Sequence, residues 1–260
     1  MAGLLVRSRV LRALPERLAV PAMRAFSGNV EYPRIEGSVA DVTKQLNSIG
    51  ARLSIPTAAL YLTKPKIEFV VRGLKTPDEL RDVQRALLLC DSKYVYPSEF
   101  AIGSFVARAI AMDHADVALD FVRQAQHLRH YVPNQTLVRL ASHYAEKEDD
   151  QEAVDEIARI VDASGIVKTH KWYGFQVANA KRQGDWARAE QIAREAAAEK
   201  RINSHVILAL LQGLEGQALA DKLPLAKYLV AKGEVFVNAA LQAVLDGTAA
   251  PSAPAPASEE

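Results

Sequence analysis

The sequence contains one cysteine, Cys90, among its 260 residues, and it has no long apolar run. A single thiol excludes an internal disulfide framework and a zinc site built from cysteines. No stretch approaches the roughly 20 apolar residues that a membrane-spanning helix requires. Both common glycine-rich phosphate-binding motifs are also missing. We therefore predict no transmembrane segment, no cofactor and no small-molecule substrate.

No group of residues forms a convincing catalytic constellation. His127 and His130 are three residues apart on an expected helix, but no nearby carboxylate pair or cysteine completes a metal site. Cys90 follows three leucines, so it fits a small core residue better than a nucleophile. We therefore predict that the chain is not an enzyme and that it holds no metal.

One pattern recurs through the stretch from Pro97 to Lys200. In each copy, an acidic residue or a glycine is followed five residues later by an alanine. The pairs are Asp113 and Ala118, Glu148 and Ala153, Gly184 and Ala189, and a weaker fourth pair, Asp221 and Ala226. The alanines are 35, 36 and 37 residues apart, and a period near 35 in helical sequence is typical of stacked hairpins. The sequence therefore predicts an all-α fold, an α-solenoid of about five stacked antiparallel helical hairpins with a period of about 35 residues.

Helix signals divide the chain around these repeats. Thr76 and Pro77 are a typical helix start inside the first expected hairpin, and Asn203 is a good N-cap for the fifth, whose second helix is expected around 223–232. A helix over about 40–53 would be capped by Ser38 or Asp41, and a last helix over about 234–245 would cover the open end. The predicted divisions are 1–26, a targeting segment; 27–65, an extension with one or two helices; 66–246, the repeats; and 247–260, a disordered Pro/Ala tail.

The first 26 residues have the composition of a mitochondrial presequence. They carry five arginines separated by apolar residues and one acid, so their net charge is +4. The arginines interrupt every apolar run that a secretory signal would need. The alternative is a basic helical arm that the mature protein keeps. We predict a protein of the mitochondrial matrix, with attachment to an inner-membrane complex left open.

The repeats resemble the pentatricopeptide repeat, a helical hairpin of 35 residues found mainly in organelle proteins. The resemblance is carried by ADVALDFVRQAQ after Asp113-His114, by the junction Tyr131-Val132-Pro133-Asn134, and by AKRQGDWARAEQI in the fourth unit. It covers about residues 66–232. The tetratricopeptide repeat, with a period of 34 residues, is the near rival.

The resemblance implies a test for RNA reading. Members of that family that read sequence bind one base per repeat through two or three side chains. The key position is normally Asn, Thr or Ser, early in the first helix and ten residues before the break. Here these positions are occupied by Gly103, Val138, Gly174 and Leu211. None of these side chains can bind a base edge, so a modular base code is absent by this criterion.

Two charged stretches are candidate interaction surfaces. Residues 146–156 carry seven acids and one lysine, and residues 165–201 carry eight cations and four acids. The candidate acidic patch comprises Glu146, Glu148, Asp149, Asp150, Glu152, Asp155 and Glu156. The candidate basic patch comprises Lys168, Lys171, Lys181, Arg182 and Arg188. A solvated helix face is the alternative interpretation of both patches.

The predicted function is a non-catalytic scaffold or accessory subunit of a large mitochondrial assembly. The solenoid surface would bind protein subunits of ATP synthase, of another oxidative-phosphorylation complex, or of the mitochondrial ribosome. The whole chain has a net charge of +1 and residues 1–26 have a net charge of +4, so the chain without them has a net charge of about −3. A negative protein is unsuited to deep burial in rRNA. Peripheral contact with rRNA stays open. The alternative is a mitochondrial RNA-binding factor in RNA processing, stability or translation.

Overall fold

The computed structural model describes residues 35–251, which belong to one compact unit. The predicted targeting segment, residues 27–34 and residues 252–260 lie outside the described residues. Within 35–251 the secondary structure is entirely helical, which confirms the all-α prediction. The helices are α1 (Val39–Gly50), α2 (Ile55–Tyr61), α3 (Lys64–Gly73), α4 (Pro77–Ser92), α5 (Glu99–Ala111), α6 (Ala115–Gln124), α7 (Asn134–His143), α8 (Gln151–Ala163), α9 (His170–Arg182), α10 (Trp186–Ala198), α11 (Ser204–Leu211), α12 (Gly216–Gly233) and α13 (Ala239–Leu245).

The predicted caps start their helices. Ser38 Oγ accepts the backbone N–H of Asp41, whose carboxylate accepts the N–H of Ser38 in return, so both proposed residues act together. Thr76 and Glu79 form the same reciprocal capping box at the start of α4. Asn203 accepts the N–H of Val206 at 3.1 Å. These bonds satisfy backbone donors that a helix start would otherwise leave unpaired.

The repeated acidic residue or glycine marks a left-handed turn between two helices. Asp113 has φ 62° after α5, and Gly184 has φ 77° after α9. In the third copy the left-handed residue is Asp149, with φ 49°, rather than Glu148. A π-helical turn, η2 (Tyr144–Glu148), follows α7 and places the break one residue later. Short polar Asp and Gly are the residues that tolerate this backbone region best.

In the fourth copy, the prediction is correct for Ala226 and wrong for Asp221. Ala226 is fully buried, like Ala118 and Ala189. Asp221, however, lies inside α12 and not at a turn, because α12 begins at Gly216, seven residues before the predicted start. The last helix also differs, since α13 begins only after Asn238, which accepts the N–H of Leu241 at 2.9 Å. It packs on α11 and α12, as expected for a helix at the end of the stack.

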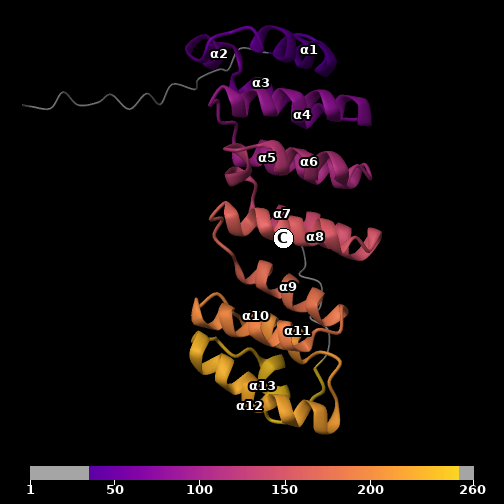
Figure 1. The fold of residues 1–260 in the computed structure, drawn as a ribbon, viewed down its shortest axis with the longest axis vertical. Helices are drawn as coiled ribbons and strands as arrows, with labels where there is room; N and C mark the ends of the chain where they lie inside the picture. The colour runs from indigo at the N-terminus through magenta and orange to yellow at the C-terminus, as the bar shows by residue number, and fades with distance from the viewer. Residues whose placement is uncertain (1–34, 252–260) are drawn as a thin grey trace, which may run out of the picture. The chain divides into compact units, whose positions relative to one another are not determined.

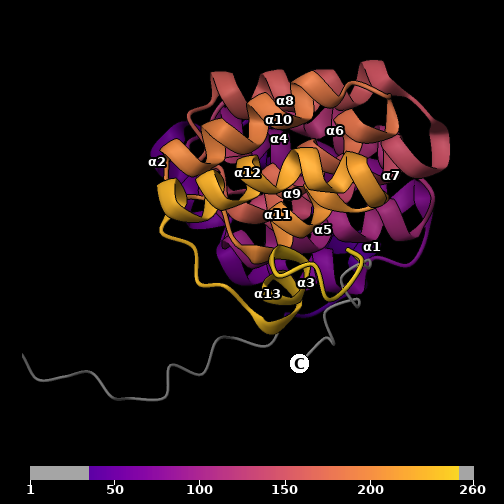
Figure 2. The same cartoon turned by 90° about the horizontal axis from the view of Figure 1, so that it is seen from below.

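The helices follow one another in chain order and lie in two layers (Figures 1 and 2). The odd-numbered helices from α3 to α13 each contact the next odd-numbered helix, and helix pairs such as α5 and α6 or α9 and α10 also pack together. The even-numbered helices form the second layer, in which α4 contacts α6, α6 contacts α8, and α10 contacts α12. The succession has one gap, because α8 makes at most marginal contact with α9 and α10.

The hydrophobic core divides at the same place. One buried cluster extends from Val42 to Trp172, and a second begins at Tyr173 and extends to Val244. Cys90 is fully buried in the first cluster, as predicted, and burial raises the pKa of its thiol to about 12. None of the helices within residues 35–251 combines the length and apolar character needed to cross a membrane.

Candidate functional site

The four positions compared with base-reading residues lie at helix contacts. Gly103 is buried in α5, and a Cβ on it would lie 3.0 Å from Pro133 at the start of α7. A Cβ on Gly174 in α9 would lie 3.6 Å from Val206 in α11. Leu211 is fully buried, and Val138 packs against the first core cluster. Two of these positions therefore lie at contacts between successive odd-numbered helices, and the other two belong to or pack on the core.

The predicted basic residues lie at two ends of α9 and on α10. At its N-terminal end, Lys168 pairs with Asp162 at 2.7 Å, and Lys171 donates to Gln135 at 2.9 Å. At its C-terminal end, Lys181 and Arg182 follow about 15 Å further along, at about 1.5 Å per residue. The structure therefore does not bring the five cations into one patch.

Lys181 and Arg182, the two cations at the end of α9, donate hydrogen bonds to backbone carbonyl oxygens of neighbouring helices. Lys181 donates to the carbonyl oxygens of Ala209 and Gln212 at the end of α11. Burial lowers its pKa, and its ammonium lies 4.9 Å from the centre of the Trp186 ring. Arg182 donates to the carbonyl of Ala145 in η2. Cations at helix C-termini interact favourably with unpaired carbonyls, which gives these residues a structural role.

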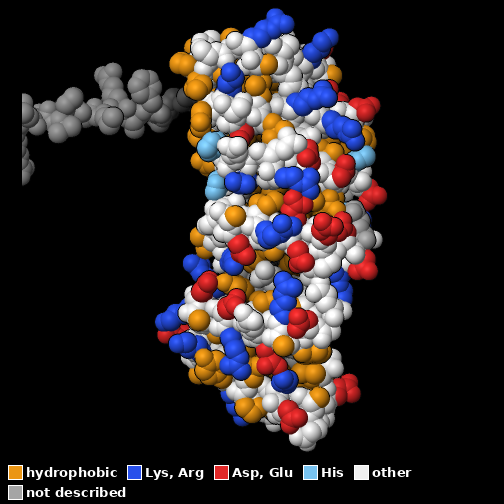
Figure 3. Space-filling model, viewed as in Figure 1, with side chains coloured by type: hydrophobic (Ala, Val, Ile, Leu, Met, Phe, Trp, Pro, Cys, Tyr) orange, Lys and Arg blue, Asp and Glu red, His pale blue; other side chains and the backbone are white. Residues whose placement is uncertain are grey.

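The predicted acidic residues also separate into groups. Four with exposed side chains surround the turn before α8, and they are Glu146, Asp149, Asp150 and Glu152. The side chain of Glu148 lies outside the described residues. Glu156 faces α6, where Arg123 binds it through two hydrogen bonds of 2.7 Å. Asp155 faces the other way, towards Arg188 of α10. Side chains of both charges cover the face of the even-numbered helices (Figure 3).

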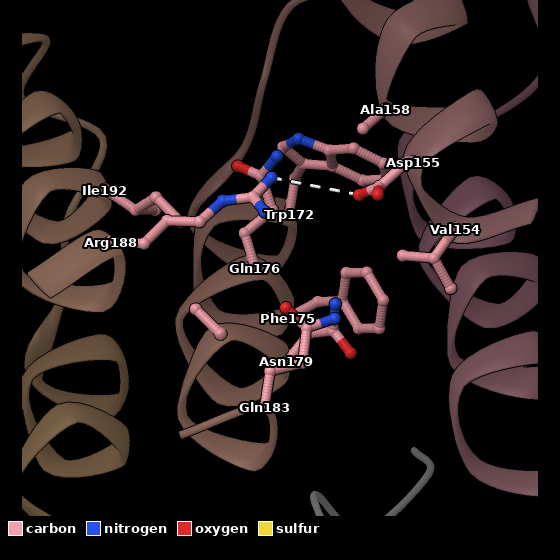
Figure 4. Close-up of a pocket in the computed structure, with 11 residues that line it drawn as sticks. Val154, Asp155, Ala158, Trp172, Phe175, Gln176, Asn179, Gln183, Arg188 and Ile192 are labelled. Carbon is pink, nitrogen blue, oxygen red and sulfur yellow. Dashed lines mark ion pairs between the residues drawn. The ribbon is translucent and has the colours of Figure 1, made fainter. Parts of the chain in front are cut away.

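The gap between α8 and α10 forms a groove, which we call the α8–α10 groove. Its α8 wall consists of residues that share one face of the helix, which are Val154, Asp155, Ala158, Val161 and Asp162. Its α10 wall is formed by Arg188 and Ile192. Arg188 and Asp155 extend toward each other across the groove, with nitrogen and oxygen 3.8 Å apart (Figure 4). At this separation they form an ion pair without a hydrogen bond.

The floor of the groove comes from α9 and carries an unpartnered donor. Trp172 is fully buried, and no acceptor within the described residues reaches its indole Nε1–H. Phe175 packs beside it, with ring centres 6.0 Å apart, and the amides of Gln176 and Asn179 continue the floor. The cavity here encloses about 20 Å³, room for one water-sized group. An unpaired buried N–H costs on the order of 1–3 kcal/mol, so this site favours an incoming acceptor.

The groove widens where α8 and α10 end. A cavity of about 400 Å³ lies there, lined by Val161, Ile166 and Val167 together with charged residues. Within the described residues, Lys168 pairs with Asp162, and Glu199 accepts the Tyr173 hydroxyl at 2.8 Å. Burial and that hydrogen bond raise the pKa of Tyr173. The guanidinium of Arg201 makes no ion pair or hydrogen bond to the described residues, and is available to a ligand.

The groove was not predicted from the sequence. Its most informative signal is α10, in which six of thirteen residues are alanine and only Trp186 and Ile192 are bulky and apolar. The aromatic cluster Trp172, Tyr173 and Phe175 was correctly expected to be mainly core, since the first two are buried and Phe175 packs against the core. Arg201 and the free indole N–H of Trp172 were missed, because burial without a partner has no sequence signature.

The histidine pair considered for metal binding remains without a completed ligand set. Among residues 35–251, no three His, Cys, Asp or Glu side chains gather in a way that could hold a metal ion. His127 instead packs on Tyr94, with ring centres 5.0 Å apart.

Comparison with known proteins leaves the chain without an assigned family: no family model, no curated protein and no solved structure matches it.

Proposed function

We propose that this chain is a helical-repeat solenoid that acts as a non-catalytic scaffold or accessory subunit in a large mitochondrial assembly. The repeat interpretation is supported by side-chain hydrogen bonds between successive helix pairs. Gln84 donates to Asp120, 36 residues away, Arg108 to the carbonyl of Leu74, 34 residues away, and Thr169 to Asn134, 35 residues away. Repeated linkage near 35 residues is what stacked hairpins of that period would produce.

The observation that carries the proposal is the packing of Gly103 and Gly174. In repeats that read RNA, this position presents a polar side chain to a base. Here both glycines face a neighbouring odd-numbered helix at ordinary or closer contact distance. The proposed basic patch is also divided, and three of its five cations already bind carbonyl or carboxylate groups of the chain closely. These features favour protein over RNA as the main partner.

The mitochondrial location in this proposal rests on the arginine-rich segment at residues 1–26. The assembly would be ATP synthase, another oxidative-phosphorylation complex, or the mitochondrial ribosome at a peripheral position.

Native sedimentation of the mature protein from mitochondria tests the proposal. We expect it to migrate with a large protein assembly and to stay there after nuclease treatment. Migration that collapses to the free protein after nuclease would favour the RNA-binding alternative, as would strong, sequence-restricted crosslinks to RNA. Migration as a free monomer under both conditions would contradict both functions.

A further inference from the structure

We infer that the α8–α10 groove binds an extended, acidic segment of a partner protein. This inference rests on the proposed protein-binding function and names the surface and the chemistry that would carry it out. Three features define the groove: the sparse contact between α8 and α10, the division of the core at Trp172, and two cavities along one face of α8.

The acidic character of the partner follows from which groups in the groove are already engaged. Each of its three carboxylates is already paired with a donor or cation of the chain itself. Asp155 accepts from Gln151 at 2.9 Å, Asp162 pairs with Lys168, and Glu199 accepts from Tyr173. An incoming cation would therefore compete with partners that the chain already supplies.

The donors are the groups left over. The indole N–H of Trp172 has no acceptor, Arg201 has no partner within residues 35–251, and Arg188 reaches Asp155 only at 3.8 Å. The amide of Gln176 also lines the floor, beside Trp172 and Arg188. A partner complementary to this set presents a carbonyl oxygen to Trp172 and a carboxylate to Arg201.

The dimensions favour an extended segment over a helix. From Asp155 to Asp162 the α8 wall spans seven residues, or about 10 Å. An extended chain covers that length with about three or four residues. The narrow part encloses only about 20 Å³ beside Trp172, which suits a carbonyl oxygen and not a helix about 10 Å wide. The wide end, about 400 Å³, has room for a small apolar side chain against Ile166 and Val167.

The test begins with a random octapeptide library displayed on phage and selected on the full chain. We expect the selected peptides to share an Asp or Glu close to a small aliphatic residue. Synthetic versions should bind about tenfold more weakly after Arg201→Gln or Trp172→Phe, each of which removes one hydrogen bond donor. The matched control Arg85→Gln removes an exposed arginine on α4, which pairs with Asp82, and should bind normally.

A second measurement uses the unaltered protein, so it does not depend on a variant that folds. The chain has two tryptophans and therefore two indole N–H signals in a ¹H–¹⁵N spectrum, and proximity to the Phe175 ring identifies the Trp172 signal in the unaltered protein. Addition of a selected peptide should move the Trp172 signal downfield, as expected for a new hydrogen bond. The Trp186 signal should stay in place.

Several results would overturn the inference: peptides selected without acidic residues, affinities unchanged by both variants, a Trp172 signal that does not move, or oligouridylate that moves it in place of peptides. If the protein still sediments with a nuclease-resistant assembly while acidic peptides fail to bind, the groove assignment alone is wrong. If sedimentation becomes nuclease-sensitive, the proposed function itself fails.

Discussion

Helix α8 faces α6 along one seam and α10 along another, and these two helix–helix boundaries differ in how they are closed. On the α6 side, Arg123 binds Glu156 through two hydrogen bonds of 2.7 Å, and the two helices contact each other. On the α10 side, Asp155 and Arg188 stay 3.8 Å apart over a groove. One helix thus carries a closed interface and an open one on neighbouring faces, although both belong to the same repeated pattern.

The difference shows that helices of one layer can follow one another without packing closely at every step. The alanine-rich α10 packs closely on α9 and α12, where small side chains allow near approach. The same small side chains cannot reach across to α8, whose facing residues include Ala158. Closing that seam would require bulkier apolar residues on at least one wall. The recurring sequence pattern marks the turns at Asp113 and Gly184, while the residues between the turns decide which seams close.

The largest contrast is expected between aromatic truncations in the two regions. Phe121 is fully buried in α6 and packs edge-on against Phe105, with ring centres 5.4 Å apart. Phe121→Ala should lower the free energy of unfolding by about 3–5 kcal/mol. Phe175→Ala, at the partly exposed floor of the groove, should cost only about 1–2 kcal/mol. Urea denaturation followed by circular dichroism measures both, and equal losses would contradict an open seam.

The two glycines at the contacts of odd-numbered helices should respond with opposite signs. A Cβ on Gly103 would lie 3.0 and 3.1 Å from the rigid Pro133 ring, so Gly103→Ala should destabilise the protein by about 1–2 kcal/mol. On Gly174 it would lie 3.6 Å from Val206, an ordinary contact. Gly174→Ala should therefore stabilise the protein by about 0.5–1 kcal/mol, because alanine restricts the unfolded chain. Thermal melts of the two variants decide the signs, and stabilisation by Gly103→Ala would show that α5 and α7 can move apart freely.

Most of the helical framework could be predicted from short signals. Ser38, Thr76 and Asn203 have local capping chemistry, so their helices begin where the sequence indicates. The buried alanines were also predictable, because they recur at fixed distances. The shift from Glu148 to Asp149 was not, since it depends on how α7 ends in a π-helical turn. The pattern itself selects Glu148, because Ala153 follows it by five residues, whereas Val154 follows Asp149 at that distance.

The candidate surfaces were harder to predict, because a charge run does not reveal its partners. Arg182 is adjacent to Lys181 in sequence, yet one binds η2 and the other binds the end of α11. Asp155 and Glu156 are likewise adjacent and face different helices. Neighbouring residues on a helix point about 100° apart, so a linear run of one sign is divided among several interfaces.

A smaller contrast is expected between the two arginines that cross the seams. Arg123→Gln should cost about 0.5–1 kcal/mol, because it removes a bidentate pair, even though the Arg123 side chain is half exposed and partly screened by solvent. Arg188→Gln should change the free energy of unfolding by less than about 0.5 kcal/mol. Urea midpoints at low and high salt measure both, and the Arg123 effect should shrink as salt rises. A larger loss from Arg188→Gln would mean that the groove is held shut by its ion pair.

The smallest expected effect is the pH dependence of the closed seam. The hydrogen bonds from Arg123 lower the pKa of Glu156 below its ordinary value of 4.5. Because the folded pKa is depressed, the stabilisation is complete above pH 4.5 and is lost as the pH falls through the lower value. The difference in stability between the unaltered protein and Arg123→Gln should therefore be constant from pH 7 to 5 and narrow below pH 4, by about 0.5 kcal/mol after screening. Urea titrations at each pH measure it, with Arg188→Gln as the matched control whose small difference should not follow this curve. A gap that widens toward acid pH would mean that Glu156 is stabilised in its protonated form, and that the closed seam does not depend on this ion pair.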